Sequence, residues 1–323
     1  MSIEERLKHF PRTRLMTAET PVERLDRMSD LLGVDLWLKR DDLTGLGLGG
    51  NKNRQLEFYF GEALTQGADT VLITGAVQSN FVRSVAAAAA RLGLKSVLQL
   101  EERVPDMSAE YYSSGNVFLG KILGGEHLSY PVGDDEVGAD NALHKRANEL
   151  RAEGRSPYVI HLGIDHPPLG ALGYVVGAAE LSRQVSDFDV AVVPSGSGAT
   201  HAGFLTGLRL SGQAAPVYGI CVRRDRNQQD ARLKTVLKKL AEMVDIDPDV
   251  TQNDILTWDG ALAPGYGIVG STTRDALTLM AQTEGIFLDP VYTAKTFAGL
   301  LGLLKEGCIQ PGQKVVMLHT GGV

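Results

Sequence analysis

The chain has 323 residues, 43% hydrophobic and 22% charged, a composition typical of a globular protein with a buried core. Its formal net charge is −7 and only 6% of residues are aromatic, so neither nucleic acid nor an anionic membrane is an expected partner. The charged N-terminus and the absence of any apolar segment of roughly 20 residues predict a cytoplasmic chain without a membrane span. Cys221 and Cys308 are not spaced as metal ligands or a redox pair, and no metal site is expected.

Short apolar runs alternate with longer helical patterns from about residue 35 onward. The expected strands are 35–39, 70–76, 96–101, 158–163, 189–197, 216–222 and 314–322. The helical patterns between them include 79–94, 141–154, 171–185 and 231–244. Strands that are apolar throughout and alternate with helices predict an α/β fold with mostly parallel sheets, covered by helices on both faces. The pattern alone leaves open whether two lobes are interleaved or sequential.

Ligands of open parallel sheets bind beyond the carboxyl ends of the strands, in the loops that begin the next helix. Four such loops are rich in small polar residues: 45–52, 74–80, 194–203 and 319–322. A functional site is therefore expected where these loops meet.

The segment 194–203, PSGSGATHAG, joins an expected strand to an expected helix. Its backbone N–H groups and the helix dipole would point at one spot, which suits a phosphate, with hydroxyl donors from Ser197 and Thr200. A plain glycine-rich turn with capping serines is the alternative. A dinucleotide fingerprint is incomplete because His201 replaces the third glycine, although Arg223 and Arg224 leave an NADP site open.

Two further loops carry polar residues at expected helix starts. Gln78, Ser79 and Asn80 precede an alanine-rich helix and suit a carboxylate, unless Ser79 is simply its N-cap. In the loop 45–52, Asn51 is expected to cap the following helix, and Lys52 falls in the first helical turn. The helix dipole and partial burial would lower the lysine pKa toward a neutral amine, the form that Schiff-base chemistry requires. A surface lysine at a helix start is the alternative.

Six motifs in order, LGGNKNRQLEF, TGAVQSN, SGSGATHAG, APGYGI, LDPVYTAK and HTGG, resemble the pyridoxal-phosphate enzymes of fold type II. The likeness runs from about Phe10 to the last residue. It is greatest to the group that holds D-cysteine desulfhydrase, L-cysteate sulfo-lyase and 1-aminocyclopropane-1-carboxylate deaminase.

The resemblance implies roles for individual residues. It implies that Lys52 binds the cofactor covalently and acts as the catalytic base, with Ser79, Tyr266 and Tyr292 as further catalytic residues. Cofactor contacts are implied for Asn51, Asn80, Gly196, Ser197, Gly198, Ala199, Thr200 and Thr293. Substrate contacts are implied for Gln78, Ser79, Asn80, Phe81, His166, Tyr266 and Tyr292.

Three positions depart from the family pattern. Thr293 stands where the deaminases have a glutamate beside the ring nitrogen, which favours elimination of a good leaving group over opening of a cyclopropane. Phe81 replaces a common histidine, and His166 lies in a loop that is longer by one residue. Both changes bear on substrate choice.

The resemblance therefore implies two α/β lobes, with 51–162 as the small domain and 1–50 plus 163–323 as the large cofactor-binding domain, in a homodimer. The expected reaction is β-elimination from L-cysteate or D-cysteine. The alternatives are a 1-aminocyclopropane-1-carboxylate deaminase-like or other small amino acid deaminase, an NADP-binding oxidoreductase and a non-catalytic binding protein.

Overall fold

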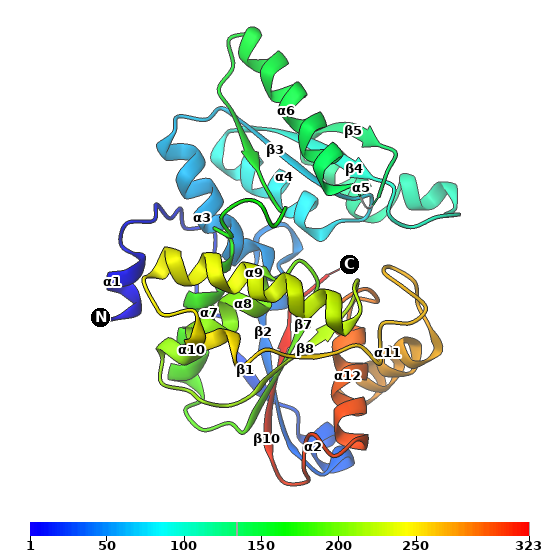
Figure 1. Cartoon of the computed structure of the whole chain (residues 1–323). Coiled ribbons are helices and arrows are strands. Elements are labelled where there is room, and N and C mark those ends of the chain that lie inside the picture. The colour runs from blue at the N-terminus through cyan, green and yellow to red at the C-terminus, as the bar shows by residue number, and fades with distance from the viewer. Residues whose placement is uncertain (134, 323) are drawn as a thin grey trace.

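The structure is a computed structural model that describes residues 1–133 and 135–322. Among these residues the strands form two sheets, one above the other in Figure 1. The larger sheet has the order β1 (Val22–Arg24), β2 (Asp35–Arg40), β10 (Lys314–His319), β7 (Val190–Ser195), β8 (Val217–Cys221), β9 (Leu256–Trp258). The smaller has the order β5 (Glu126–Tyr130), β4 (Lys95–Glu101), β3 (Thr70–Ala76), β6 (Pro157–Ile160).

Neighbouring strands in these sheets run parallel except for the pair β1 and β2. The predicted α/β class with mostly parallel sheets is thus confirmed. Three short strands were not predicted, namely β1, β5 and β9. The predicted division into a small domain, 51–162, and a large domain, 1–50 plus 163–323, stays a prediction. Residues 134 and 323 of these ranges lie outside the described residues.

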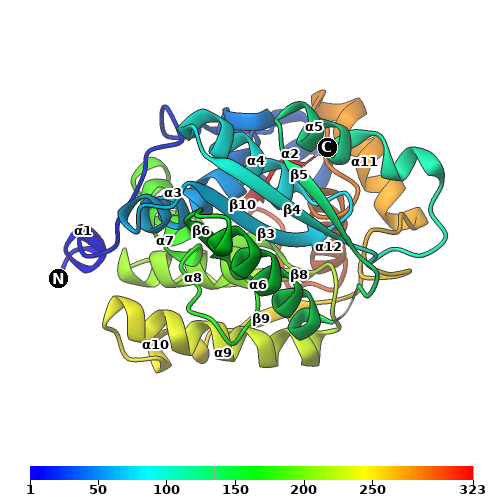
Figure 2. The same cartoon turned by 90° about the horizontal axis from the view of Figure 1, so that it is seen from above.

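Helices cover the sheets and are seen from a second direction in Figure 2. Their bounds in the first half are α1 (Ile3–Leu7), α2 (Asp26–Leu32), α3 (Lys52–Thr65), α4 (Asn80–Leu92), α5 (Gly115–Ile122) and α6 (Glu136–Ala152). In the second half they are α7 (Ala171–Gln184), α8 (Ala199–Leu210), α9 (Arg226–Val244), α10 (Asp249–Gln252), α11 (Ser271–Glu284) and α12 (Thr293–Lys305). Short 3₁₀ turns lie at Asp41–Leu43, Leu46–Leu48 and Ala109–Tyr112.

One apolar cluster joins the two sheets. It includes Val71 and Ile73 of β3 from the smaller sheet and Val193 and Val316 from the larger one. The helices α3, α4, α7 and α8 contribute buried side chains between them. Because the cluster is continuous, the apolar surface that it buries favours one arrangement of the two sheets.

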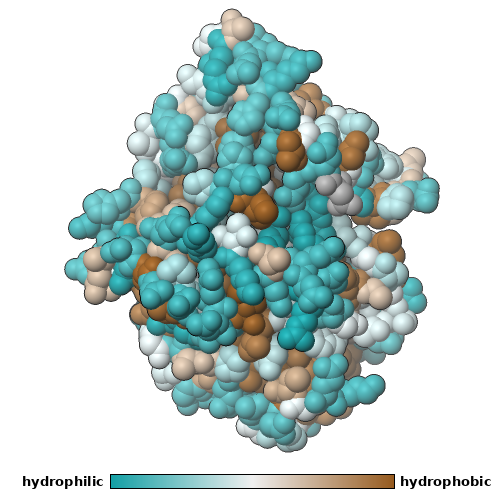
Figure 3. Space-filling view, in the orientation of Figure 1, coloured by the Kyte–Doolittle hydropathy of each residue, from teal (hydrophilic) through white to brown (hydrophobic). Residues whose placement is uncertain are grey.

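The outer surface is mainly hydrophilic on the face shown in Figure 3, unlike the apolar cluster inside. Hydrophobic residues form only small groups on this face (Figure 3). None of the helices in 1–133 and 135–322 has the length and apolar character that a membrane crossing requires.

Helix α3, which begins with Lys52, is anchored by a buried ionic network. The Arg54 guanidinium donates to Asp41 and to Glu180 at 2.8 Å, and Lys39 Nζ donates to Glu180 at 2.5 Å. All four side chains are buried, with exposed fractions of 1 to 4%. Since each buried charge has an opposite partner, the network fixes the start of α3 against β2 and α7.

The loop before Lys52 packs directly on the loop after β10. Gly50 and Gly321 both have positive φ, 104° and 69°, and a Cβ on Gly321 would come 2.8 Å from Gly50 Cα. The Asn51 N–H donates to Thr320 O at 2.9 Å. Glycine is required here because the two backbones approach too closely for any side chain.

Candidate active site

A cleft between the two sheets gathers residues from all four loops that were expected to form a site. It encloses about 1060 Å³ between its walls, including space open to solvent. The loop-derived residues are Asn51 and Lys52; Thr74, Gly75, Ser79 and Asn80; Pro194, Gly196, Ser197, Gly198 and Thr200; and Thr320 and Gly321. Phe81, Tyr266 and Tyr292 also line it. The loops converge because β3, β7 and β10 all end at this cleft.

Lys52 is the first residue of α3, as expected, and its side chain is half-buried in the cleft. Burial lowers the pKa of its amine to about 8, which confirms the expected direction. No hydrogen bond or ion pair reaches Nζ from the described residues, and the Phe81 ring lies beneath it at 5.0 Å. Desolvation without an opposite charge leaves a large neutral fraction of this amine near pH 8.

The loop between β7 and α8 exposes unpaired donors. Within the described chain, no hydrogen bond uses the backbone N–H groups of residues 196–200. Two of the loop carbonyls are held by arginines, since Arg224 donates to Gly196 O and Arg232 donates to Ser197 O. Consecutive free N–H groups at a helix N-terminus form a site for an anion, and a phosphate fits it best.

Asn51 does not cap α3, so that expectation was wrong. Its backbone is helical (φ −57°, ψ −23°), a conformation in which the side chain makes no capping bond. Instead its Nδ2 donates to Thr200 Oγ1 at 2.9 Å, and Gln55 Nε2 donates to the same hydroxyl at 2.9 Å. Thr200 is thus fixed by two amides from α3, which ties the loop of Lys52 to the anion-binding loop.

The N-terminus of α4 provides a second set of donors. Ser79 is its N-cap, because its hydroxyl accepts from Val82 N at 3.3 Å. The backbone N–H groups of Asn80 and Phe81 have no partner in the described residues. Asn116 donates to Asn80 Oδ1 at 2.9 Å, which turns the Asn80 Nδ2 donor toward other partners. These groups could bind a carboxylate or a hydroxyl in the cleft.

Gln78 is not brought to the cleft. Its side chain accepts from Asn116 N at 2.8 Å and donates to Tyr111 O and Ser114 O at 2.5 and 3.0 Å. All of its amide groups thus hold the segment between the Ala109–Tyr112 turn and α5. A substrate contact by Gln78 stays a prediction, and its observed contacts anchor a neighbouring loop.

Thr293 also lies behind the cleft wall. Its hydroxyl donates to Asp289 Oδ1 at 2.8 Å and accepts from Asp289 N at 2.7 Å. Asp289 also accepts from Tyr292 N, so it fixes the first turn of α12. Burial raises the pKa of the Asp289 carboxyl, despite these bonds. A contact of Thr293 with a ring nitrogen stays a prediction.

Two tyrosines of the cleft lining contact each other, and Tyr292 lies next to Gly196 of the anion-binding loop. The hydroxyls of Tyr266 and Tyr292 are 2.7 Å apart, and the rings are T-shaped at 6.2 Å. Burial, reinforced by the neighbouring Tyr266, raises the pKa of Tyr292 well above its usual value. Tyr292 is therefore protonated at neutral pH and can donate a proton or a hydrogen bond.

Charged residues also line the cleft, and of these only Arg223 was named from the sequence, as a possible contact of an NADP phosphate. Arg103 pairs with Glu101 at 2.8 Å, and the Arg223 guanidinium lies 6.0 Å from the centre of the Tyr266 ring. The Glu136 carboxylate forms ion pairs with Arg224 at 2.8 Å and with Arg232 at 3.3 Å. Burial alone would raise the pKa of Glu136, but Arg232 and Arg224 lower it. Arg103 and Arg232 lie in segments far apart in the sequence, so no local pattern identified them, whereas the adjacent Arg223 and Arg224 were considered only for an NADP site.

His166 and Ala199 lie in a smaller cavity beside the cleft. This side cavity shares Leu162, Gly163 and Ser197 with the cleft wall. The predicted substrate contact of His166 and the predicted cofactor contact of Ala199 thus stay predictions.

The sequence resembles those of known proteins over nearly its whole length. The family model described as "Pyridoxal-phosphate dependent enzyme" matches residues 13–321. D-cysteine desulfhydrase of Klebsiella pneumoniae is 39% identical over 325 residues, covering 100% of this chain and 97% of that relative. The D-cysteine desulfhydrase of Salmonella choleraesuis is 38% identical, covering 98% of this chain and 95% of its own.

Solved structures agree with these relatives. The crystal structure of an ACC deaminase homologue aligns with a TM-score of 0.89 at 37% identity, covering 100% of this chain and 95% of that one. The crystal structure of O-ureido-L-serine synthase aligns with a TM-score of 0.68 at 19% identity, covering 98% of this chain and 91% of that one. This likeness shows a shared fold. The implied fold type II architecture is therefore confirmed. The chain belongs to the family of pyridoxal-phosphate-dependent enzymes.

Proposed function

We propose that this protein is a carbon–sulfur lyase that converts D-cysteine by β-elimination into pyruvate, sulfide and ammonium. The observation that carries the proposal is the unpartnered amine of Lys52, which lies in one cleft with two sets of free N–H donors. The identity of 38–39% to D-cysteine desulfhydrases over nearly the whole chain supports this substrate.

The donors in the cleft fit pyridoxal phosphate. The free N–H groups of 196–200 and the Thr200 hydroxyl suit its phosphate, and the Lys52 amine suits its aldehyde. The free Nδ2 of Asn80 suits its ring hydroxyl. Bound there, the cofactor supplies an electron sink for the negative charge that develops at the substrate α-carbon.

Lys52 is the proposed general base at the α-carbon. Its Nζ removes the α-proton in its neutral form, which the lowered pKa of about 8 favours. Ser79 and the free N–H groups at the start of α4 hold the substrate carboxylate. This hold keeps the α-proton oriented toward the base.

The tyrosine pair is proposed to stabilise the leaving group. Tyr292, held protonated by burial, donates a hydrogen bond to the departing sulfur, and Tyr266 orients it through the 2.7 Å hydrogen bond. Phe81 lies under Lys52 and contributes an apolar wall that limits water beside the amine.

A second candidate substrate is L-cysteate, with sulfite as the leaving group. Arg103 and Arg223 in the cleft favour it, because a sulfonate requires cationic or hydrogen-bonding partners that a thiol does not. A deaminase acting on 1-aminocyclopropane-1-carboxylate is a third candidate, favoured by the structural likeness to an ACC deaminase homologue.

The test is a visible absorption spectrum of the purified protein with pyruvate detection. The panel is D-cysteine, L-cysteine, L-cysteate and 1-aminocyclopropane-1-carboxylate. We expect a yellow protein whose spectrum D-cysteine changes, with pyruvate and sulfide released. Lys52→Ala is expected to abolish turnover while circular dichroism stays unchanged. Turnover by a folded Lys52→Ala protein would refute the assignment, and sulfite from L-cysteate alone would select the second candidate.

We also propose that the protein works as a cytoplasmic homodimer with residues 51–162 as its small domain, as the family resemblance implies. Light scattering on the holoenzyme tests the dimer, and cell fractionation tests the location. A monomeric mass at micromolar concentration would contradict the dimer.

A further inference from the structure

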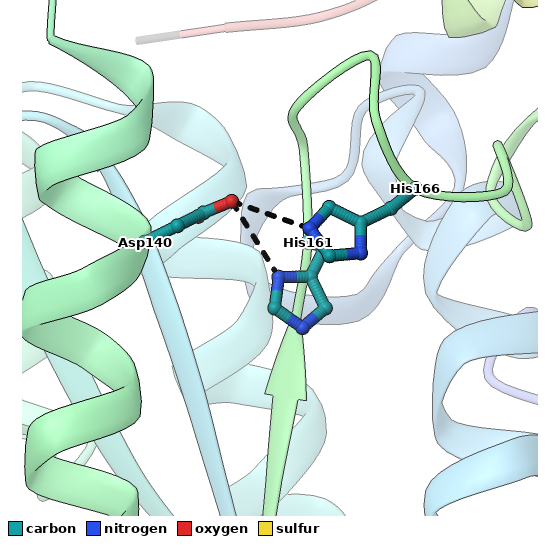
Figure 4. Close-up of side chains that lie close together, drawn as sticks. All are labelled: Asp140, His161 and His166. Carbon is teal, nitrogen blue, oxygen red and sulfur yellow. Dashed lines mark ion pairs between the residues drawn. The ribbon is translucent and has the colours of Figure 1, made fainter.

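Two histidines and a carboxylate meet at the wall that separates the cleft from the side cavity. Asp140 lies on α6, His161 follows the end of β6, and His166 lies in the next loop (Figure 4). Asp140 lines the cleft, whereas both histidines line the side cavity. The mechanism proposed above uses none of the three.

Their polar atoms converge without hydrogen bonds among them, although each histidine lies within ion-pair distance of Asp140 (Figure 4). Asp140 Oδ2 lies 3.6 Å from His161 Nδ1 and 3.5 Å from His166 Nε2, and all three atoms lie within 4.8 Å of each other. These separations exceed an ordinary hydrogen bond of about 2.7–3.2 Å. His161 Nδ1 is a buried atom without a hydrogen-bond partner in the described residues. A buried polar atom without a partner is costly unless something else satisfies it.

Double protonation of the histidines does not explain the arrangement. The rings of His161 and His166 stack with their centroids 3.7 Å apart and their planes at 10°. Two positive rings at this spacing would repel each other, so at least one imidazole is neutral. A neutral imidazole carries a nitrogen lone pair, which is the form that binds a metal ion.

We propose that Asp140, His161 and His166 bind one divalent transition-metal ion of the zinc class. At bond lengths of about 2.0–2.1 Å, two ligands of a tetrahedral ion are about 3.3 Å apart. The observed 3.5 and 3.6 Å are close to that value, and binding would require the stacked rings to rotate about their side-chain bonds until both nitrogen lone pairs point at one ion. Two imidazoles with one carboxylate suit Zn²⁺ or Co²⁺ better than Mg²⁺ or Ca²⁺, which prefer oxygen ligands.

The ion would fix the loop 161–168 to α6. In the structure, helix α9 holds this loop by two hydrogen bonds. Arg232 donates to Leu162 O at 3.1 Å, and Lys239 Nζ donates to Ile164 O at 2.6 Å. Leu162 and Gly163 of the same loop belong to the cleft wall. A metal ion at Asp140 would thus order a wall of the cleft without belonging to the reacting groups.

The test is metal uptake by the tag-free holoenzyme, freed of excess cofactor, in a Cys308→Ser background that removes the exposed thiol. Zn²⁺ binding is measured by equilibrium dialysis with elemental analysis. We expect one ion per chain, and a loss of affinity of about tenfold or more in His166→Gln. His9→Ala removes an exposed histidine far from the cluster and is expected to bind as the parent does.

A second readout reports on the loop. Zn²⁺ is expected to slow amide hydrogen exchange in 161–168 in the parent protein and not in His166→Gln. If His166→Gln proves unfolded by circular dichroism, Asp140→Asn replaces it in both measurements. Absence of stoichiometric uptake by the parent, or equal uptake by the parent and both cluster variants, would overturn the proposal.

Discussion

The pKa values of Lys52 and Tyr292 in the cleft are shifted mainly by burial. Lys52 has a lowered pKa because water is excluded from it, and no carboxylate restores its charge. Tyr292 is affected in the opposite sense, since burial raises its pKa and keeps its proton in place. Burial thus favours the neutral form of both groups, a base in one case and an acid in the other.

The reactivity of Lys52 is predicted to depend on pH. A pKa of about 8 means that half of the amine is neutral at that pH and that the neutral fraction levels off roughly one pH unit higher, whereas an ordinary lysine titrates near 10.5. The rate of attachment of added pyridoxal phosphate to cofactor-free protein, followed by absorbance, should rise through pH 8 and level off about one unit above it. Lys52→Ala should show no attachment, and a rate that still climbs tenfold from pH 9 to 10 would contradict the prediction.

The same shift has a consequence for stability. Between pH 8 and 10.5 the unfolded chain retains a proton on Lys52 that the folded cofactor-free protein has released. The contribution of Lys52 to the free energy of unfolding therefore rises with pH across this window. Urea titrations of cofactor-free parent and Lys52→Met at pH 7.5 and 9.5 should show the parent gaining stability relative to the variant. An unchanged difference would contradict this.

Tyr292→Phe is predicted to lower kcat by about 10²-fold, the usual scale for loss of a hydrogen-bond donor to developing negative charge, with little change in KM. The substitution removes the hydroxyl that contacts Tyr266 and leaves the ring packing intact. Tyr112→Phe, at an exposed tyrosine, is the matched control. Steady-state kinetics with D-cysteine measures both, and a rise in KM at unchanged kcat would instead assign Tyr292 to substrate binding.

At the scale of elements, α3 is the part whose placement matters most. It carries Lys52 at its first residue, and its Asn51 and Gln55 amides hold Thr200 beside the anion-binding loop. The buried ionic network below it fixes its start. A change in that network would therefore be expected to affect both stability and cofactor affinity.

Glu180→Gln is predicted to lower the free energy of unfolding by about 3–5 kcal/mol, because it leaves Lys39 and Arg54 with less than a full partner in the interior. Glu19→Gln is the control, since its ion pair with Arg183 is more than half exposed and is expected to contribute less than about 1 kcal/mol. Urea midpoints measure both. Equal effects of the two substitutions would show that the network is not needed for stability.

At the scale of the whole molecule, the cleft lies between two sheets that share one apolar cluster. Cofactor contacts are proposed on both sides, from α4 above the cleft and from the loop after β7 below it (Figure 1). Binding should therefore stabilise the two sheets together. A ligand at 100 times its Kd contributes about 2.7 kcal/mol.

Hydrogen exchange is predicted to slow in both β3 and β7 when pyridoxal phosphate is added to cofactor-free protein, and Tm should rise. Lys52→Ala retains the phosphate donors but loses the amine, so its Tm should rise less. Protection confined to one sheet would contradict joint stabilisation.

The sequence predicted the strands that are long and apolar, and with them the loops that form the cleft. It missed β1, β5 and β9, which are short or mixed in polarity, such as the EHLSY of β5. Their pairing comes from sheet edges and not from local pattern. The start of α3 was predicted at the right residue, but the Asn51 cap was not formed, because Thr200 offers its amide a tertiary partner.

Other parts of the site could not be predicted, because they depend on contacts between distant segments. The substrate contact of Gln78 stays a prediction, and its observed hydrogen bonds to Tyr111, Ser114 and Asn116 could not be foreseen from the sequence. The cluster of Asp140, His161 and His166 combines a helix, a strand end and a loop, and no spacing in the sequence marks it as a ligand set.

The packing of Gly50 against Gly321 has a consequence for synthesis in the cell. The lysine loop near residue 50 is completed only by a backbone segment some 270 residues later, since Asn51 donates to Thr320 and the Gly321 backbone rests on Gly50. Contacts this distant in sequence form late in folding. A ribosome-bound chain in which residues 320 and 321 have not yet emerged would therefore not capture the cofactor, and loading would follow their emergence.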